Sequence, residues 1–251
     1  MKLHLDSVHF IETNEPIDLS IPLVAGDKNL SAWYVNPPIM EPVMENGFVG
    51  AVALGGAVNF RSIFFNPHGH GTHTECLGHI TPEIFSINSS LKTYFFKAQL
   101  ITVVPQKVQL NGVEDEVISR SELNESSWES DCEALIIRTL PNVSSKKSKD
   151  YSSTNPPYLS TDIIALLNEK GIKHLLIDLP SVDRENDGGA LAFHHQFWGV
   201  PDQLNVERTI TELIFVSDTV MDGAYLLELQ TAPFENDATP SRPIIYKIKK
   251  G

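Results

Sequence analysis

The chain has 251 residues, of which 41% are hydrophobic and 20% charged, an ordinary globular composition that can bury a core around an enclosed active site. We expect a single domain over residues 1–251. The 32 acidic residues outnumber the 19 Lys and Arg residues, and the formal net charge of −13 would repel a phosphate backbone, so nucleic acid is excluded as a partner.

The N-terminus and the most apolar run both argue against export and membrane insertion. Residues 1–6 lack the uninterrupted apolar stretch of a signal peptide, and Asp6 and Glu12 oppose export further. The apolar run 48–58 is interrupted by glycines and falls short of the about 20 residues that a spanning helix needs. With two cysteines only, the chain cannot build a disulfide scaffold. We therefore expect a cytoplasmic protein with no membrane segment.

Short strand patterns occupy the first part of the chain. Residues 17–23 alternate apolar and polar side chains and then meet a proline, as an edge strand leading into a loop does. The runs 48–54 and 62–65 are apolar, short and bounded by Gly, Asn or Pro, which favours strands over helices. The histidine-rich segment 68–79 therefore begins where a predicted strand ends.

Later elements alternate between strands and helices. Ser160 or Thr161 can cap a helix that Gly171 ends, and a second helix is predicted from about 206 to 213. The β-branched or apolar runs that predict further strands are 98–104, 134–138, 175–178 and 224–229.

Residues 141–160 have the composition of a loop. Serines, lysines and prolines dominate this stretch, so it cannot form a core of its own. We predict a long mobile surface loop here, which could cover the site as a lid.

The densest chemical signal lies between positions 68 and 79, where four of the nine histidines gather: His68, His70, His73 and His79. Glu75 stands among them, and imidazole with carboxylate is the ligand set that zinc, manganese and iron(II) prefer. On an extended strand His73 and Glu75 point to the same face and can share one ion. The segment predicts a divalent metal site.

Two other interpretations of this segment stay open. Its imidazoles could cap turns or satisfy backbone groups, although such a loop would not need the carboxylate. Cys76 could act as a nucleophile, because a thiolate beside a histidine attacks carbonyls. The same histidines are better used as metal ligands, which makes Cys76 the weaker candidate.

The segment resembles the signature of the cyclase family, which contains the bacterial-type, metal-dependent kynurenine formamidases: His-x-Gly-Thr-His-x-Asp-x-Pro-x-His. Gly71-Thr72-His73, Glu75 and His79 match this pattern in register, with Glu75 in place of the aspartate and Leu77 in place of the proline. The register places Gly69 at the first histidine, so His68 and His70 compete for that role, and we favour His68 with a one-residue bulge.

Other parts of the chain resemble the same family. Asp18-Leu19-Ser20 followed by Trp33 is similar to its N-terminal strand and aromatic substrate-pocket segment. The runs 177–183 and 191–195 resemble its Ser-x-Asp and His-His regions, and 211–213 resembles its Glu-Asn-Leu. The resemblance implies that His194 and Glu212 complete the metal site, and the intervening segment 197–202 brings in Trp198 as a second candidate for the pocket lining.

The resemblance implies an α/β fold of the swivelling β/β/α type, with a mixed sheet or barrel-like β core and flanking helices. It also implies a homodimer or larger homo-oligomer. For the mechanism, it implies one or two divalent ions, Zn²⁺ first and Mn²⁺ second, held by His68, His73, Glu75, His194 and Glu212. His79 would be the general base that takes a proton from a metal-activated water.

The resulting hypothesis is an arylformamidase-like amidohydrolase that releases formate from an N-formyl aromatic amine such as N-formylkynurenine. A hydrolase that opens a cyclic amide, imide or lactone would use the same site. A binding protein that keeps the metal without turnover is the third possibility, and the spare histidine beside the ligands argues against it.

Overall fold

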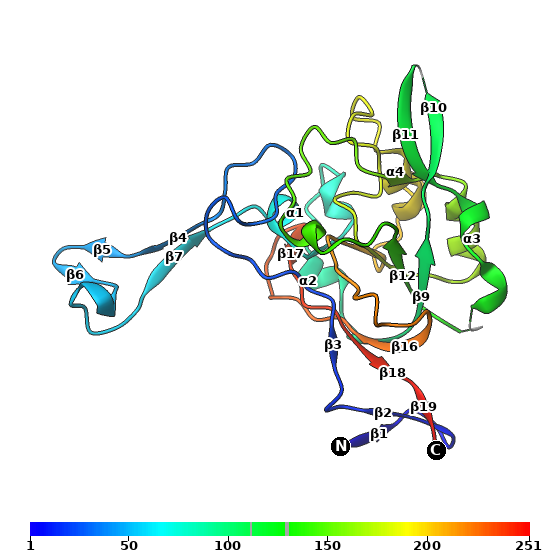
Figure 1. The fold of residues 1–251 in the computed structure, drawn as a ribbon, viewed down its shortest axis with the longest axis horizontal. Helices are drawn as coiled ribbons and strands as arrows, with labels where there is room; N and C mark the ends of the chain where they lie inside the picture. The colour runs from blue at the N-terminus through cyan, green and yellow to red at the C-terminus, as the bar shows by residue number, and fades with distance from the viewer. Residues whose placement is uncertain (111, 129–130) are drawn as a thin grey trace.

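A computed structural model describes residues 1–110, 112–128 and 131–251, and its centre is a nine-stranded mixed sheet (Figure 1). In spatial order the strands are β17 (Ala238–Pro240), β8 (His73–Glu75), β15 (Thr209–Glu212), β14 (His174–Ile177), β12 (Ala134–Thr139), β9 (Phe95–Val103), β16 (Gly223–Glu228), β18 (Ile244–Lys247) and β3 (Ile17–Asp18). The four strands β15, β14, β12 and β9 run parallel, and the outer strands pair antiparallel.

The parallel strands are apolar on both faces because both faces are covered. Every residue of β12 and β14 is buried, and alternate side chains enter two separate cores. Leu135 and Ile137 belong to one core, whereas Ala134 and Ile136 belong to the other. This explains why these strands read as unbroken apolar runs in the sequence.

Helices flank the sheet. α3 (Ile163–Glu169) and α4 (Ala192–Trp198) pack into the first core, and α2 (Ile87–Ser90) contributes Ile87 to the second. α3 ends just before Gly171, whose φ of 70° is the left-handed conformation that glycine adopts without strain. The arrangement confirms the predicted α/β class with a mixed sheet as its β core. No helix among the described residues is long and apolar enough to cross a membrane.

The helix predicted over 206–213 is wrong, because residues 209–212 form β15. All four side chains of this strand are buried between neighbouring strands, and the β-branched run Thr209-Ile210-Thr211 suits that position. The sequence pattern also did not predict α4, whose apolar side chains span only two turns. The predicted strands at 98–104, 134–138, 175–178 and 224–229 coincide with β9, β12, β14 and β16 within a few residues.

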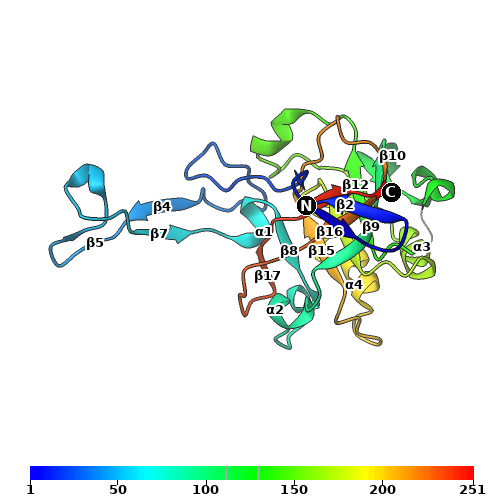
Figure 2. The ribbon, with the colours of Figure 1, turned by 90° about the horizontal axis from the view of Figure 1, so that it is seen from below.

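A long arm leaves the body between residues 39 and 64 (Figures 1 and 2). β4 (Ile39–Pro42) pairs with β7 (Arg61–Phe64), and beyond them lie β5 (Met44–Glu45), β6 (Phe48–Val49) and the 3-10 turn η1 (Val52–Leu54). The apolar run 48–54 is thus a short strand and a turn on the arm, outside the central sheet. Of the two strands predicted in this region, 62–65 corresponds to β7, whereas 48–54 is a strand only in its first two residues, β6.

The remaining elements are small. β1 (Lys2–His4), β2 (His9–Glu12) and β19 (Lys249–Lys250) join the two termini in one sheet. β10 (Gln106–Leu110), β11 (Val113–Ile118) and β13 (Tyr158–Leu159) form another. The chain also forms the 3-10 turns η3 (Arg120–Glu122), η4 (Glu125–Ser127) and η5 (Ser144–Ser148). The segment 141–160 contains η5 and β13, and its Tyr151 is buried; its mobility and its role as a lid stay predictions.

Candidate metal centre and active site

The short helix α1 (Pro67–His70) contains both candidates for the first metal ligand, His68 and His70, and directs them to different sides. The Asn66 side chain accepts a hydrogen bond from the Gly69 amide and caps this short helix, and Pro67 occupies its first position. His70 is buried on the far side, where its Nδ1 accepts from the Asn66 amide and its Nε2 donates to the Asn36 carbonyl. Both His70 nitrogens are therefore used by the backbone, whereas His68 turns toward Glu75.

β8 places His73 and Glu75 on one face, as the strand period requires, while Thr74 bonds Thr211 on the other. The antiparallel register sets His73 directly opposite Glu212, and their Nε2 and Oε2 atoms lie 3.5 Å apart. His73 Nδ1 donates to the Gly71 carbonyl, so the tautomer leaves Nε2 as a lone pair facing the carboxylates.

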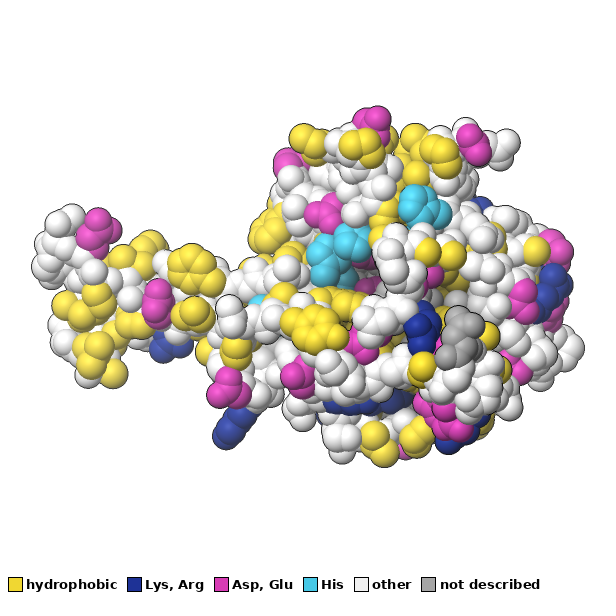
Figure 3. Space-filling model, turned by 90° about the horizontal axis from the view of Figure 1, so that it is seen from above, with side chains coloured by type: hydrophobic (Ala, Val, Ile, Leu, Met, Phe, Trp, Pro, Cys, Tyr) yellow, Lys and Arg dark blue, Asp and Glu magenta, His cyan; other side chains and the backbone are white. Residues whose placement is uncertain are grey.

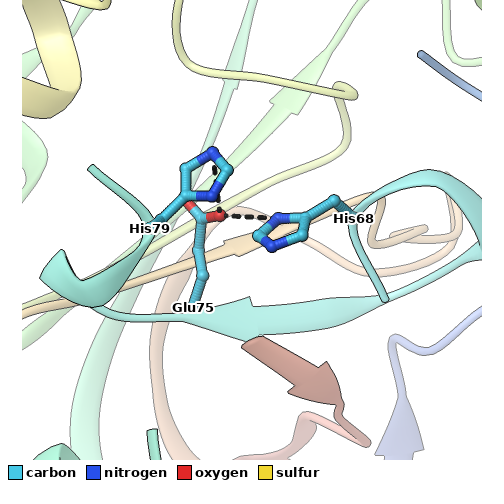
Figure 4. Close-up of side chains that lie close together, drawn as sticks. All are labelled: His68, Glu75 and His79. Carbon is cyan, nitrogen blue, oxygen red and sulfur yellow. Dashed lines mark ion pairs between the residues drawn. The ribbon is translucent and has the colours of Figure 1, made fainter. Parts of the chain in front are cut away.

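Glu75 lies where two groups of ligands meet. Its Oε2 is 3.0 Å from His68 Nδ1 and 4.0 Å from His79 Nε2 (Figure 4). The same oxygen is 4.0 Å from His73 Nε2, and Oε1 is 3.0 Å from His194 Nε2. Two sets of ligand atoms each fit around one ion: His68, Glu75 and His79, and His73, Glu75 and Glu212. The carboxylate shared by both sets is the one that the family signature has as aspartate.

Two buried atoms of this cluster have no partner in good hydrogen-bonding geometry among the described residues: His73 Nε2, and Glu75 Oε2 although it lies 3.0 Å from His68 Nδ1. Leaving such atoms unsatisfied in a protein interior costs free energy, and a cation between them would satisfy both at once. The donor set of imidazoles and carboxylates is the one that zinc and manganese take. The residues fit a divalent metal ion.

The protonation behaviour of the cluster points to the same conclusion. Burial and the charge of Glu75 raise the pKa of Glu212. Burial would also raise the pKa of Glu75, but the charge of His79 and the nearby imidazoles of His194 and His68 hold it well below the usual range. Burial of His194 is outweighed by Asp183 and Glu75, which raise its pKa to about 10. The cavity therefore attracts positive charge.

Two carboxylates outside the cluster orient its histidines. Asp183 caps the start of α4, accepting from the amides of Phe193 and His194, and its Oδ2 lies 2.6 Å from His194 Nδ1. Asp237 Oδ2 lies 2.8 Å from His68 Nε2 and 3.3 Å from His79 Nδ1. Such partners fix the tautomer and orientation of metal-site histidines. Asp183 falls within a run that resembles the family, but no local sequence signal marks Asp237.

His79 ends the 3-10 turn η2 (Leu77–His79) and is the most open member of the cluster, with 31% of its side chain exposed. Its ring stacks on that of His68 at 4.2 Å between centroids. A pocket of about 310 Å³ lies over it and is also lined by Trp33, Arg184 and Leu191. Histidine side chains are visible in a hollow of this face (Figure 3).

Trp33 and Trp198, the two tryptophans predicted to line the pocket, have different positions. Trp33 lines the pocket, and it and Tyr34 adopt φ values near 60°, a conformation that is uncommon for large side chains and recurs at functional sites. Trp198 is completely buried behind His194, with ring centroids 5.3 Å apart, and its Nε1 donates to the Arg208 carbonyl. The structure does not bring Trp198 to the pocket.

Cys76 has no access to a substrate. Its side chain is fully buried in the second core, on the opposite face of the chain from Glu75, and burial raises the pKa of its thiol. A nucleophile needs an accessible thiolate, so the position of Cys76 disfavours the thiol mechanism.

Two candidate ligand triads that share one glutamate lie beneath an open pocket, an arrangement that suits a metal-dependent hydrolase. Residues 17–184 match the model of a family described as "Putative cyclase". Kynurenine formamidase of Bacillus cereus is 30% identical over 241 residues, covering 95% of this chain and all of that protein, and the Bacillus mycoides enzyme is 29% identical. The chain therefore belongs to the cyclase family.

Solved structures share the fold at lower sequence identity. Isatin hydrolase A from Labrenzia aggregata superposes with a TM-score of 0.64 at 12% identity, covering 92% of this chain and 93% of that one. A predicted metal-dependent hydrolase from Bacillus stearothermophilus gives a TM-score of 0.60 at 17% identity, covering 92% and 98%. These likenesses extend the agreement in fold over nearly the whole chain.

Proposed function

We propose that this protein is an arylformamidase-like hydrolase that cleaves the amide bond of an N-formyl aromatic amine, such as N-formylkynurenine, releasing formate and the free amine. The observation that carries the proposal is the pair of unsatisfied buried atoms, His73 Nε2 and Glu75 Oε2, between two ligand triads under the pocket. The near full-length similarity to kynurenine formamidases supports the substrate class.

For the metal, we propose one or two divalent ions, with zinc ahead of manganese. They would be held by His68, His73, Glu75, His194 and Glu212. A bound divalent ion lowers the pKa of a coordinated water and polarises a carbonyl group. Glu75 stands where the family signature has aspartate, and its side chain is longer by one methylene group. Its carboxylate belongs to both ligand triads.

The residues of the chain then have separate tasks. Asp237 holds His79 Nδ1, so His79 Nε2 faces Glu75 at the floor of the pocket. From there His79 Nε2 accepts a proton from the attacking water and returns it to the nitrogen of the leaving amine. Trp33 offers an aromatic face to the substrate ring in the pocket above.

The location and the assembly are part of the proposal. Both cysteines are buried and neither forms a disulfide among the described residues, which supports the cytoplasm as the location that we propose. We also propose that it works as a homodimer or larger homo-oligomer.

The test is metal analysis followed by a hydrolysis screen on protein purified without chelator. We expect bound zinc or manganese and turnover of N-formylkynurenine that exceeds turnover of a cyclic imide and an aryl lactone. Faster opening of the cyclic substrates would replace the formamidase by the ring-opening enzyme. Bound metal without any hydrolysis would mean a binding protein.

The role of His79 has its own test. His79→Ala should lower kcat by about 10²- to 10⁴-fold, the usual contribution of a general base, while metal stays bound. The matched control is His195→Ala, since His195 neighbours His194 but lies outside both ligand triads. Loss of metal from His79→Ala would reassign His79 as a ligand, and unchanged turnover would remove it from the mechanism.

A further inference from the structure

Arg184 lies in the wall of the catalytic pocket, and it is the only Lys or Arg among the described residues that line this pocket. It belongs to the loop between β14 and α4, which also brings Glu185, Asp187 and Leu191 to the pocket. The planar fork of a guanidinium matches the two oxygens of a carboxylate, which makes arginine the usual partner of this group. The pocket can therefore offer a carboxylate one strong and directional partner.

Asp115 on β11 holds the guanidinium of Arg184 in place. Its side chain is fully buried, and it accepts from Arg184 Nε at 2.9 Å and from Nη2 at 3.1 Å. Asn155 Nδ2 and the Tyr158 hydroxyl donate to the same carboxylate at 2.8 Å and 3.2 Å. Burial would raise the pKa of Asp115, but the hydrogen bonds from Arg184 and Asn155 hold it below its usual value. The charged carboxylate thus fixes the plane of the guanidinium before any substrate binds.

Arg184 keeps hydrogen-bonding capacity for a ligand. Each terminal nitrogen of a guanidinium carries a pair of N–H groups. Nε and Nη2 donate to Asp115, and Nη1 donates to the Asn186 carbonyl at 2.5 Å. Since these bonds use a single N–H of each terminal nitrogen, Nη1 and Nη2 both keep one N–H that has no acceptor among the described residues. The side chain is 26% exposed, so a carboxylate in the pocket can reach it.

The same loop carries two carboxylates that lack a cationic partner. Each accepts a pair of backbone hydrogen bonds, which for Asp187 come from Gly189 and Leu191 and for Glu185 from Ser153 and Asn155. Neither carboxylate forms an ion pair among the described residues, although both line the pocket together with Arg184. A carboxylate has lone pairs beyond those that these bonds use. Glu185 and Asp187 can therefore attract and hold an ammonium group.

One guanidinium and two carboxylates on one pocket wall suit a zwitterion. A ligand with a carboxylate alone would be repelled by Glu185 and Asp187, and a ligand with an amine alone would leave the N–H groups of Arg184 unpaired. An α-amino acid group carries both charges close together. We propose that Arg184 is a specificity-determining residue that binds the carboxylate of the substrate's α-amino acid group, while Glu185 and Asp187 bind its ammonium.

This role of Arg184 rests on the proposed function and narrows its substrate class, because the N-formyl aromatic amine must then carry a free α-amino acid group. The pocket of about 310 Å³ has the size of a small-ligand site, and Trp33 and His79 line it as well. One substrate molecule can therefore place its α-amino acid group at Arg184 and its formamide at His79.

Steady-state kinetics with a series of substrates separate recognition from a structural role of Arg184. The series is N-formylkynurenine and its analogues without the carboxylate, without the amine and without both. For the wild type, removal of the carboxylate should raise KM by about 10- to 100-fold, as the loss of charge-assisted hydrogen bonds does, with a much smaller change in kcat. Arg184→Lys should bring the KM values for N-formylkynurenine and its decarboxylated analogue close together, because lysine keeps the charge but loses the fork. A structural role alone would change both KM values by the same factor.

The matched control is Arg120→Lys, because the guanidinium of Arg120 pairs with Glu125 and Glu169 outside the pocket. It should keep the wild-type ratio of the two KM values. If Arg184→Lys does not fold, the double variant Asp115→Asn with Arg184→Gln replaces the ion pair by two amide side chains and leaves no unpaired buried charge. The same convergence of KM values is expected in this variant.

Calorimetric titration with L-kynurenine, the product amine, tests binding without turnover. We expect Arg184→Lys to bind it at least about tenfold more weakly than the wild type. This result, with no hydrolysis of any formamide, would overturn the proposed function and leave the role of Arg184 intact. Hydrolysis of the whole series with equal KM values, or equal affinities of wild type and Arg184→Lys for L-kynurenine, would overturn the role of Arg184 and leave the proposed function intact. An analogue without the amine that matches the KM of N-formylkynurenine would overturn the role of Glu185 and Asp187.

Discussion

Asp237 serves two histidines with one oxygen atom, and this makes it the residue outside the ligand set on which the site depends most. Hydrogen bonds from His68 and His79 hold the pKa of Asp237 well below its usual range, so it is charged at any working pH. Its backbone carbonyl also accepts from the Cys76 amide and ties the loop to β8. The side chain is thus rigidly placed against both rings.

We predict that Asp237→Asn lowers kcat by about 10- to 100-fold and weakens metal binding by a similar factor, as loss of a carboxylate partner does for metal-bound histidines. KM should change little, since Asp237 does not line the pocket. Steady-state kinetics and metal titration measure both effects. Glu235→Gln is the matched control, because its carboxylate bonds Ser86 and Asn88 away from the site. Equal effects of the two variants would contradict the prediction.

Sequence reasoning at this scale succeeded where the chemistry is local. The spacing of two between His73 and Glu75 requires a shared face on a strand, and β8 gives them one. The choice between His68 and His70 depends on the Asn36 carbonyl, a loop atom 34 residues away from His70 that no spacing rule reveals. Asp237 likewise reaches the site only because β17 pairs with β8.

Among the elements, the central strands were predictable because their apolar runs are buried on both faces. The same reasoning misplaced the run 48–54, since an apolar composition does not tell whether a segment packs on its own core or is exposed on an arm. The sequence predicts a helix where β15 forms, because this short buried run is compatible with either period. The pairing of this segment with β8 and β14 in the sheet determines that it is a strand.

Strand β14 begins with a histidine whose burial should be visible in the pH dependence of stability. The His174 ring packs on Phe96 and its Nδ1 bonds Thr209 Oγ1, and burial lowers its pKa from 6.5 to about 3. Below pH 6.5 His174 is protonated in the unfolded chain, whereas in the folded chain it stays neutral until about pH 3. The contribution of His174 to stability is therefore complete above pH 6.5 and is lost as the pH falls.

The expected slope is at most about 1.4 kcal/mol of unfolding free energy per pH unit for this one group. Denaturant unfolding of wild type and His174→Gln between pH 7 and pH 4, both with chelator present, should show a shallower decline in the variant. His195→Gln, at a partly exposed histidine, is the control for the substitution itself. Parallel curves for wild type and His174→Gln would show that the ring is already protonated in the folded state.

At the scale of the whole molecule, the proposed metal centre joins parts of the chain that lie far apart in sequence. α1, β8, α4 and β15 would each supply one or more ligands, so an ion bound there would link these elements to each other. A ligand that binds only the folded state stabilises it by RT ln(1 + [L]/Kd), about 2.7 kcal/mol at a hundredfold excess over Kd. For a chain of this length that corresponds to a rise in Tm of roughly 5–10 °C.

We predict that chelation lowers the Tm and that added zinc or manganese restores it, which differential scanning calorimetry measures. Glu75→Gln should abolish the response, because this side chain belongs to both ligand triads, and His68→Ala should reduce it. His70→Gln should lower the starting Tm through its lost backbone bonds but keep the full response to metal. A response that disappears with His70 and survives without His68 would transfer the first ligand to His70, and the hydrogen bonds that now occupy both His70 nitrogens would then have to break when metal binds.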